Sequence, residues 1–289
     1  MDTATAPATE SDFRAVLRII HARTGMTLTG DARSLLQSAI VDRAEALGLE
    51  STEAYARFLG VRLTQADEIE ELLDRIGCLE SAFFADAPQL EHFERTILPA
   101  LIEARAGTKR LRLWSAACAT GEEAYTIAMI VRRVLGDRFA DWRVEIIGTD
   151  VSGRALDHAR AGEYSAAAIA PVDSETRARW FEAEGARWAV HPEVRAMVTF
   201  TPQSLVNPLA ARRRGPFDAI FCRDTLRFFD IRTRDRIVAM LTANLAHDGM
   251  LLLSPGDVRS DAGGPVATVD RVTAGAVFGH DPAPVRASA

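Results

Sequence analysis

The sequence contains little cysteine, no long hydrophobic run and no excess of positive charge. Cysteine occupies three of 289 positions, and Cys78, Cys118 and Cys222 lie far apart. This number and spacing favour neither a disulfide framework nor a zinc site, and reduced thiols are typical of the cytoplasm. No stretch reaches the ~18 apolar residues that a membrane helix needs, and residues 1–10 lack the pattern of a signal peptide. We therefore expect a cytoplasmic protein with no direct membrane insertion.

The net charge is acidic, at −6, with 40 acidic against 34 basic residues. Such a chain exerts no general attraction on nucleic acid or anionic lipid, so we expect no nucleic-acid partner. The basic run at 212–214 can bind an acidic partner or remain a solvated loop. The six histidines are scattered without metal-ligand spacing, so no metal site is predicted.

Apolar residues recur at helical spacing from residue 11 to residue 77. Phe13, Val16, Leu17 and Ile20 follow the i, i+3, i+4, i+7 pattern of an amphipathic helix. Three further stripes follow it, and the first consists of Leu35, Leu36, Ile40, Ala44 and Leu47. We expect a helical N-terminal domain over 11–77, a disordered tail at 1–10, and a linker with a connecting helix over 78–109.

Strand and helix patterns alternate from residue 110 to residue 280. Short β-type runs lie at 111–114, 144–150, 217–222 and 250–253, with amphipathic segments between them. This alternation predicts an α/β domain with a parallel, doubly wound sheet. Residues 162–200 interrupt it and predict a small β insertion with short strands at 187–190 and 198–200. One or two antiparallel strands within 269–278 would close the sheet, and 281–289 would be a loose tail.

Small residues fill the turn between the first strand and the next helix, from Ser115 to Gly121. They let backbone approach a ligand closely, and a helix N-terminus favours a carboxylate or a phosphate. The turn lacks the glycine pattern of dinucleotide folds and the lysine of a P-loop. A tight connection with packing roles alone accounts for it equally well. Glu122 and Glu123 begin the helix, where they stabilise its dipole, and one of them can bind a ligand ammonium group.

Two more groups of polar residues follow predicted strands. Asp150 ends the second strand, where a carboxylate can accept hydrogen bonds from ribose hydroxyls; the alternative is a cap or turn role before the helix at Ser152. We favour the ribose role because the small-residue turn precedes it. Residues 221–230 leave another strand end, where we expect Asp230 to cap the next helix and Cys222 to be a buried packing residue.

Together these segments resemble the chemotaxis receptor glutamate methyltransferase family over residues 11–280. The matching segments are 113–129, 148–150 with 159–164, 215–223, 83–84, and 24–25 with 43–49 in the helical block. The resemblance implies a Rossmann-like S-adenosylmethionine methyltransferase domain behind a helical domain. It implies methyl transfer to glutamate side chains of a chemoreceptor-like or other signalling protein, with S-adenosylhomocysteine as the product. We also expect a monomer.

The resemblance also implies a set of cofactor-binding residues. Glu122 would hold the methionine amino group, Asp150 the ribose, and Leu205 would lie beside the adenine, while the backbone from Ala116 to Gly121 would cradle the methionine end. The complete set is Ser81, Ala116, Ala117, Cys118, Gly121, Glu122, Asp150, Ser204, Leu205, Arg223 and Asp224.

Several positions depart from the family pattern. The family's Asn-x-Thr-x-Phe-Phe-Arg segment reads 79–85 here, with Ser81 for the threonine and Ala85 for the arginine. Its Leu-Asn-Leu near the adenine reads 203–205, its Cys-Arg-Asn ends in Asp224, and the tyrosine four residues later is Phe228. The family's late Gly-His-Ser-Glu reads 254–257.

These departures affect the acceptor side of the reaction. Ala85 removes a positive charge and Phe228 removes a hydroxyl, both of which help to hold an acceptor. Asp224 adds a negative charge where a glutamate would enter, and like charges repel. No catalytic residue is assigned. Three alternatives stay open: an active methyltransferase with an altered acceptor side, a catalytically impaired relative that binds the cofactor and acts as a regulatory or interaction protein, or a scaffold that binds neither cofactor nor acceptor. The retained turn and Asp150 argue against the third.

Overall fold

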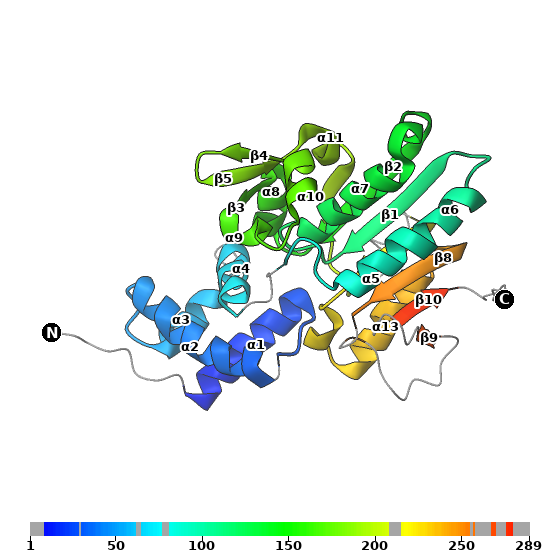
Figure 1. Cartoon of the computed structure of the whole chain (residues 1–289). Helices are drawn as coiled ribbons and strands as arrows, with labels where there is room; N and C mark the ends of the chain where they lie inside the picture. The colour runs from blue at the N-terminus through cyan, green and yellow to red at the C-terminus, as the bar shows by residue number, and fades with distance from the viewer. Residues whose placement is uncertain are drawn as a thin grey trace. The chain divides into compact units, whose positions relative to one another are not determined.

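The computed structural model describes residues 9–28, 30–61, 65–76, 81–207, 215–254, 257, 267–269 and 276–279. The expectations for residues 1–8, Cys78, 212–214 and 281–289 lie outside these residues. Two compact units divide the chain (Figure 1). One is Met1–Glu80 with Phe228–Arg234, and the other is Ser81–Arg227 with Asp235–Ala289.

The first unit contains four helices from the N-terminal part of the chain. They are α1 (Glu10–Thr24), α2 (Gly30–Ala46), α3 (Thr52–Leu59) and α4 (Gln65–Arg75). Thr9 and Asp12 form a capping box at α1, and the Ser51 hydroxyl accepts from the backbone N–H of Ala54 at the start of α3. Phe13, Val16 and Ile20 are fully buried, so the first predicted stripe is confirmed as a core face.

The second predicted stripe is partly wrong. Leu36, Ile40 and Ala44 are buried, but Leu35 is 50% exposed and Leu47 is 38% exposed. A helix turns by about 100° per residue, so Leu35 and Leu36 cannot share one narrow core face. Leu47 lies beyond the end of α2, where the periodicity no longer applies.

The second unit is built on a seven-stranded sheet in the order β6-β2-β1-β7-β8-β10-β9. Its strands are β1 (Arg110–Ala116), β2 (Arg143–Asp150), β6 (Val198–Pro202), β7 (Phe217–Cys222), β8 (Leu245–Leu253), β9 (Ala267–Val269) and β10 (Ala276–Gly279). The first five strands are parallel, and β10 pairs antiparallel with β8 and β9. This confirms the doubly wound, Rossmann-like architecture.

Helices pack along this sheet (Figure 1). They include α5 (Ala87–His92), a π-helical turn (Phe93–Ile97), α6 (Leu98–Ala104), α7 (Glu122–Leu135), α8 (Gly153–Ala161) and α13 (Ile231–Thr242). Helix α7 contacts β1, β2 and β6, while α8 contacts β2 and β6. Asp230 accepts from the N–H of Thr233, which confirms its predicted role as the cap of α13.

The strand order reverses beside β1. The chain passes from β1 to β2 and β6 on one side, then returns to β7 on the other side of β1. Ser115 of β1 stands in register with Phe221 of β7, so both strands end together. Ligands of open α/β sheets bind outside the carboxyl ends of the strands at such a switch point. The segments that follow β1 and β7 therefore define where a site is expected.

The insertion is a separate three-stranded antiparallel sheet. It contains β3 (Glu163–Ser165), β4 (Phe181–Glu184) and β5 (Arg187–Val190), with α9 (Ala166–Ile169), α10 (Ser174–Trp180) and α11 (Pro192–Arg195). The strand expected at 198–200 does not belong to it. Residues Val198–Pro202 instead pair parallel with β2 in the main sheet, where Val198 and Phe200 join the core.

Two glycines, Gly148 on β2 and Gly121 in the turn after β1, allow close packing against β6 and α8. A Cβ at Gly148 would lie 2.6 Å from the ring of Phe200, and a Cβ at Gly121 would lie 2.7 Å from the Cβ of Ala159. Gly121 also has φ +95, in the left-handed region that side chains disfavour. Small residues are therefore required here for packing as well as for the turn.

We expect Gly121→Ala to destabilise the second unit by about 3 kcal/mol, because backbone strain and overpacking add. Gly185→Ala is the matched control, since Gly185 has φ +62 but nothing within 4 Å of an added Cβ; it should cost about 1 kcal/mol. All four tryptophans lie between 114 and 188, so urea unfolding followed by tryptophan fluorescence reports on this unit. Equal losses in the two variants would contradict the packing argument.

Candidate functional site

The turn after β1 has an unusual backbone. Ala117 has φ 61 and Ala119 has φ 44, both in the left-handed region, and Gly121 follows at φ 95. The turn is held by hydrogen bonds from Cys118 N to the Thr149 carbonyl and from Gly121 N to the Cys118 carbonyl, each 2.9 Å long. Non-glycine residues keep such conformations only where the surroundings impose them. The chain therefore folds tightly over the carboxyl end of β1.

Asp150 is the side chain that holds this turn in place. Its Oδ2 accepts from the N–H of Ala119 and its Oδ1 from the N–H of Ser152, both at 2.9 Å, and the residue is only 5% exposed. Ser152, not Asp150, caps α8. Asp150 thus has a turn role, as the alternative expected. Each carboxylate oxygen has a second lone pair, so these bonds are compatible with a ligand hydroxyl as a further donor.

Glu122 begins α7 and is 4% exposed. The hydroxyl of Thr120 lies 2.7 Å and 3.0 Å from its two oxygens. Burial raises the pKa of Glu122, while hydrogen bonds from Thr120 and from Ser81, and the charge of His158, oppose the rise. The structure therefore brings Ser81 to Glu122. A buried carboxylate with a raised pKa would be stabilised by a nearby cation such as an ammonium group.

Glu123, in the first turn of α7, and Arg223, which follows β7, form a buried ion pair. Glu123 Oε2 lies 3.5 Å from Arg223 Nη1, and Glu123 Oε1 accepts from the hydroxyl of Ser115 at 2.7 Å. Burial raises the pKa of Glu123, and Arg223 opposes that rise most strongly. From the sequence, Glu123 was expected to stabilise the helix dipole or to bind a ligand ammonium group, and its ion pair was not expected. One pattern in the sequence could have indicated the pair. Glu123 closely follows β1, Arg223 follows β7, and the carboxyl ends of neighbouring parallel strands lie close together.

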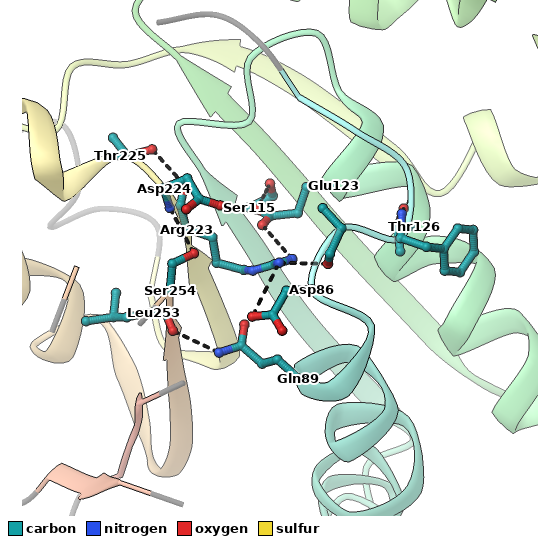
Figure 2. A network of polar contacts seen from close by, with 12 residues as sticks. Asp86, Gln89, Ser115, Glu123, Thr126, Arg223, Asp224, Thr225, Leu253 and Ser254 are labelled. Carbon is teal, nitrogen blue, oxygen red and sulfur yellow. Dashed lines mark hydrogen bonds and ion pairs between the residues drawn. The ribbon is translucent and has the colours of Figure 1, made fainter. Parts of the chain in front are cut away.

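Arg223 also contacts the segment before α5 (Figure 2). Its Nη2 donates to the carbonyl of Ala85 at 2.7 Å and lies 3.8 Å from Asp86 Oδ2. Arg223 is 8% exposed, so it is a buried cation between two carboxylates. Ala85, the position of the family's arginine, therefore lies against Arg223 through its backbone.

Asp224 follows Arg223 and is exposed. Its φ is 56, a conformation in which Asp and Asn are enriched, so the change from the family's asparagine fits the backbone. Its N–H donates to the hydroxyl of Ser254, and Asp257 accepts from the N–H groups of Thr225 and Arg227. Ser254 and Asp257 thus brace this loop, a role that the sequence analysis did not assign.

Phe228 lies in a different compact unit from Ala85 and Asp224. It belongs to the compact unit of the N-terminal helices, where its carbonyl accepts from the N–H of Thr27 at 2.6 Å. Its side chain is half-buried.

The end of β6 lies beside Asp150. The N–H of Gln203 donates to the carbonyl of Asp150 at 2.8 Å, Ser204 is half-buried, and Leu205 is 7% exposed. Gln203 itself is 6% exposed. Its Nε2 and Oε1 have no hydrogen-bond partner within the described parts of the chain. Gln203 was not among the site residues expected from the sequence.

Two of the three cysteines lie among the described residues. Cys118 and Cys222 are buried, and burial raises the pKa of both thiols well above the ordinary value, as expected of packing residues. Within the residues that the structure describes, no group of three or more His, Cys, Asp and Glu side chains could hold a metal ion. None of the helices searched in that same part is long and apolar enough to cross a membrane.

Comparison with known proteins gives two family matches and several similar relatives. Residues 11–76 match the all-alpha domain of the CheR methyltransferases, and residues 79–261 match their SAM binding domain. The Chemotaxis protein methyltransferase 1 of Pseudomonas aeruginosa is 31% identical over 257 residues, covering 86% of this chain and 91% of the relative. The chemotaxis protein methyltransferases of Salmonella typhimurium and Escherichia coli are each 30% identical, covering 84% of this chain and 82% of the relative.

These matches cover both units and confirm the predicted resemblance, including the S-adenosylmethionine-binding domain. The chain therefore belongs to the CheR methyltransferase family, with S-adenosylmethionine as the cofactor of its second domain.

Proposed function

We propose that this protein transfers the methyl group of S-adenosylmethionine to glutamate side chains of a chemoreceptor-like or related signalling protein. The observation that carries the proposal is the pair of buried carboxylates, Glu122 and Asp150, at the two ends of the tight turn after β1. The names of the relatives, chemotaxis protein methyltransferases, support the class of acceptor.

The residues present fit the cofactor. Glu122 would bind the methionine ammonium group, because its buried carboxylate would be stabilised by a cation. Asp150 would accept from the ribose hydroxyls, and the N–H groups at the start of α7 would face the methionine carboxylate. Ser81, Ser204 and Leu205 would complete the site. When bound, the cofactor supplies an electrophilic methyl group on a sulfonium.

The protein's part in the reaction is positioning. A glutamate acceptor is already ionised at neutral pH, so no general base is required, and the rate depends on alignment and on the local charge. Arg223 supplies a positive charge, although Glu123 and Asp86 already balance it. Exposed Asp224 repels an incoming carboxylate. We expect slow transfer to ordinary receptor glutamates, or an acceptor with basic residues near the methylated position.

The second candidate function is a catalytically impaired relative that binds the cofactor and regulates a partner. Ala85, Asp224 and Phe228 favour it, because each removes or opposes a contact to the acceptor while the cofactor side is retained. Both candidates place the protein in the cytoplasm as a monomer, with no nucleic-acid partner. The buried, unpaired thiols of Cys118 and Cys222 are compatible with a reducing compartment.

Calorimetric titration with S-adenosylhomocysteine tests the cofactor site. We expect micromolar binding that Asp150→Ala weakens by about 100-fold or more, because the variant loses both the ribose contacts and the anchor of the turn. Asp157→Ala is the matched control, since Asp157 is an exposed aspartate on α8 that pairs only with Arg160 among the contacts described. If folded protein shows no heat of binding at millimolar S-adenosylhomocysteine, the proposal is wrong.

The role of Glu122 predicts a pH dependence. An ammonium group binds the ionised carboxylate, and the pKa of Glu122 is raised above its ordinary 4.5. Affinity for S-adenosylhomocysteine should therefore fall as the pH is lowered below neutrality, as Glu122 takes up a proton at a higher pH than an ordinary glutamate would. Glu122→Gln should bind about tenfold or more weakly at neutral pH and lose most of this pH dependence. If the affinity of Glu122→Gln depends on pH as strongly as that of the unaltered protein, Glu122 does not bind the ammonium group.

The acceptor side is tested by restoring the family residues. The variant with Ala85→Arg and Asp224→Asn should raise methyl transfer to receptor glutamates by about tenfold or more, because it regains a cation and loses a repelling charge. Transfer of radiolabelled methyl groups to purified receptor at saturating S-adenosylmethionine measures this, and the affinity for S-adenosylhomocysteine is measured alongside because Asp224 is among the expected cofactor-binding residues. No gain would show that these positions are not what limits the reaction.

A further inference from the structure

The hydroxyl of Tyr164 connects the insertion to the turn after β1. Tyr164 lies on β3 of the insertion (Figure 1), is 1% exposed, and donates to the carbonyl of Thr120 at 2.7 Å. Burial raises the pKa of this phenol well above its ordinary value, so it keeps the proton that it donates. A side chain that comes 44 positions later in the chain therefore holds one peptide group of the turn.

Thr120 stands between two residues with left-handed backbone. Ala119 has φ 44 and Gly121 has φ 95. Such conformations persist only where the surrounding contacts impose them. The N–H of Ala119 is held by Asp150, and the carbonyl of Thr120 is held by Tyr164. Together these contacts fix the backbone that carries the Thr120 side chain.

The hydroxyl of Thr120 bonds the buried carboxylate of Glu122. It lies 2.7 Å and 3.0 Å from the two carboxylate oxygens. Threonine is branched at Cβ and stiff at χ1, so its backbone largely decides where its hydroxyl lies. The same hydrogen bond lowers the pKa of Glu122 against the rise that burial causes. The Thr120 backbone therefore affects both the direction and the charge of this carboxylate.

The ring of Tyr164 also lies beside the segment of the second donor to Glu122. The hydroxyl of Ser81 bonds Glu122 as well. Phe83, two residues later, meets the ring of Tyr164 edge to face, with the ring centroids 4.8 Å apart. One buried tyrosine thus contacts both segments whose hydroxyls reach Glu122.

We propose that Tyr164 is a positioning residue for the ammonium end of the cofactor. By holding the Thr120 carbonyl, it keeps the Thr120 hydroxyl on the carboxylate of Glu122, which would bind the ammonium group. The inference rests on the proposed function, because Glu122 has this role only under it. Tyr164 itself would act through Thr120, without touching the cofactor or the acceptor.

Tyr125 provides a matched control in the same unit. It is also 1% exposed, and its hydroxyl donates to the carbonyl of Ala159 on α8 at 2.6 Å. Ala159 has no polar side chain, so this bond joins α7 to α8 without placing a donor to Glu122. Removing either phenol should lower the melting temperature, because each removes a buried hydrogen bond. Ligand affinity, in contrast, separates the two tyrosines.

The first test compares S-adenosylhomocysteine with methylthioadenosine, which lacks the ammonium and carboxylate groups, by calorimetry. Tyr164→Phe should bind S-adenosylhomocysteine about tenfold more weakly, a difference of about 1.4 kcal/mol, and should bind methylthioadenosine as tightly as the unaltered protein does. Tyr125→Phe should leave the ratio of the two affinities unchanged. Equal losses for both ligands in Tyr164→Phe would mean a general disturbance of the turn and would overturn the inference.

The second test asks whether Tyr164 acts through Thr120. Thr120→Val keeps the branched shape and removes the hydroxyl, so it should also bind S-adenosylhomocysteine about tenfold more weakly. Adding Tyr164→Phe to it should cause little further loss, because the phenol would act through a hydroxyl that is already gone. Losses that add in the double variant would contradict the proposed route.

The pH dependence of binding gives a third measurement. Loosening the Thr120 hydroxyl should raise the pKa of Glu122 further, because burial is then less opposed. Since an ammonium group binds the ionised carboxylate, the affinity of Tyr164→Phe for S-adenosylhomocysteine should begin to fall at a higher pH than that of the unaltered protein. Identical profiles would count against the inference. The polar groups that face Glu122 are those of Thr120, Ser81, His158, Tyr164 and Cys118. The imidazole of His158 is present in both proteins, so its own titration cancels in the comparison.

The two proposals fail in different ways. If the unaltered protein does not bind S-adenosylhomocysteine, the cofactor site itself is wrong and the inference falls with it. If the unaltered protein and Tyr164→Phe bind it equally well, the cofactor site stands and only the positioning role of Tyr164 is lost.

Discussion

The carboxylate of Asp150 is the constraint on which the candidate site depends. It accepts from the turn after β1 through Ala119 and from the start of α8 through Ser152, while the carbonyl of the same residue accepts from Gln203 after β6. One residue thus fixes the positions of three segments at the carboxyl edge of the sheet. Because the turn contains two alanines with positive φ, it would relax without such an anchor.

A second constraint acts on the other side of the switch point. Arg223 is buried between Glu123 and Asp86 and also bonds the carbonyl of Ala85, so it ties the end of β7 to α7 and to the segment before α5. Removing one member of a buried ion pair costs more than the pair contributes, because it leaves an uncompensated charge. Arg223 is therefore committed to structure in the free protein. Its charge alone is a weak replacement for the arginine that the family has at position 85.

Local pattern predicted the frame of the molecule well. The apolar repeats of the helical block and the alternation of strands with helices each arise from burial of one face, which is visible in a short window of sequence. Residues 198–200 were placed in the insertion because such a short strand carries no information on its partner. Its pairing with β2 depends on Phe200 filling the space that Gly148 leaves open, a contact between residues far apart in the chain.

The candidate site was predicted in part, for a related reason. The small-residue turn and Asp150 are adjacent to strands that periodicity reveals, so their positions followed from the fold. Gln203 differs, because nothing in its neighbours marks a polar side chain whose two ends lack partners once it is buried. The Glu123–Arg223 pair likewise joins residues 100 positions apart. An unpaired buried amide and a long-range ion pair both depend on which residues become buried together, and a single sequence does not reveal that.

Under the proposed function, the residues that would bind the methionine ammonium group and the ribose follow other strands than the two departures from the family pattern at 85 and 224. Asp150 and Glu122 belong to the β1, β2 and β6 side of the switch point, whereas Ala85 and Asp224 adjoin Arg223 at the end of β7. Under the proposed function, the loss of a positive charge at position 85 and the gain of a negative one at 224 would act mainly on the acceptor. The fold permits this because the two groups of residues are carried by different strand ends of one rigid sheet.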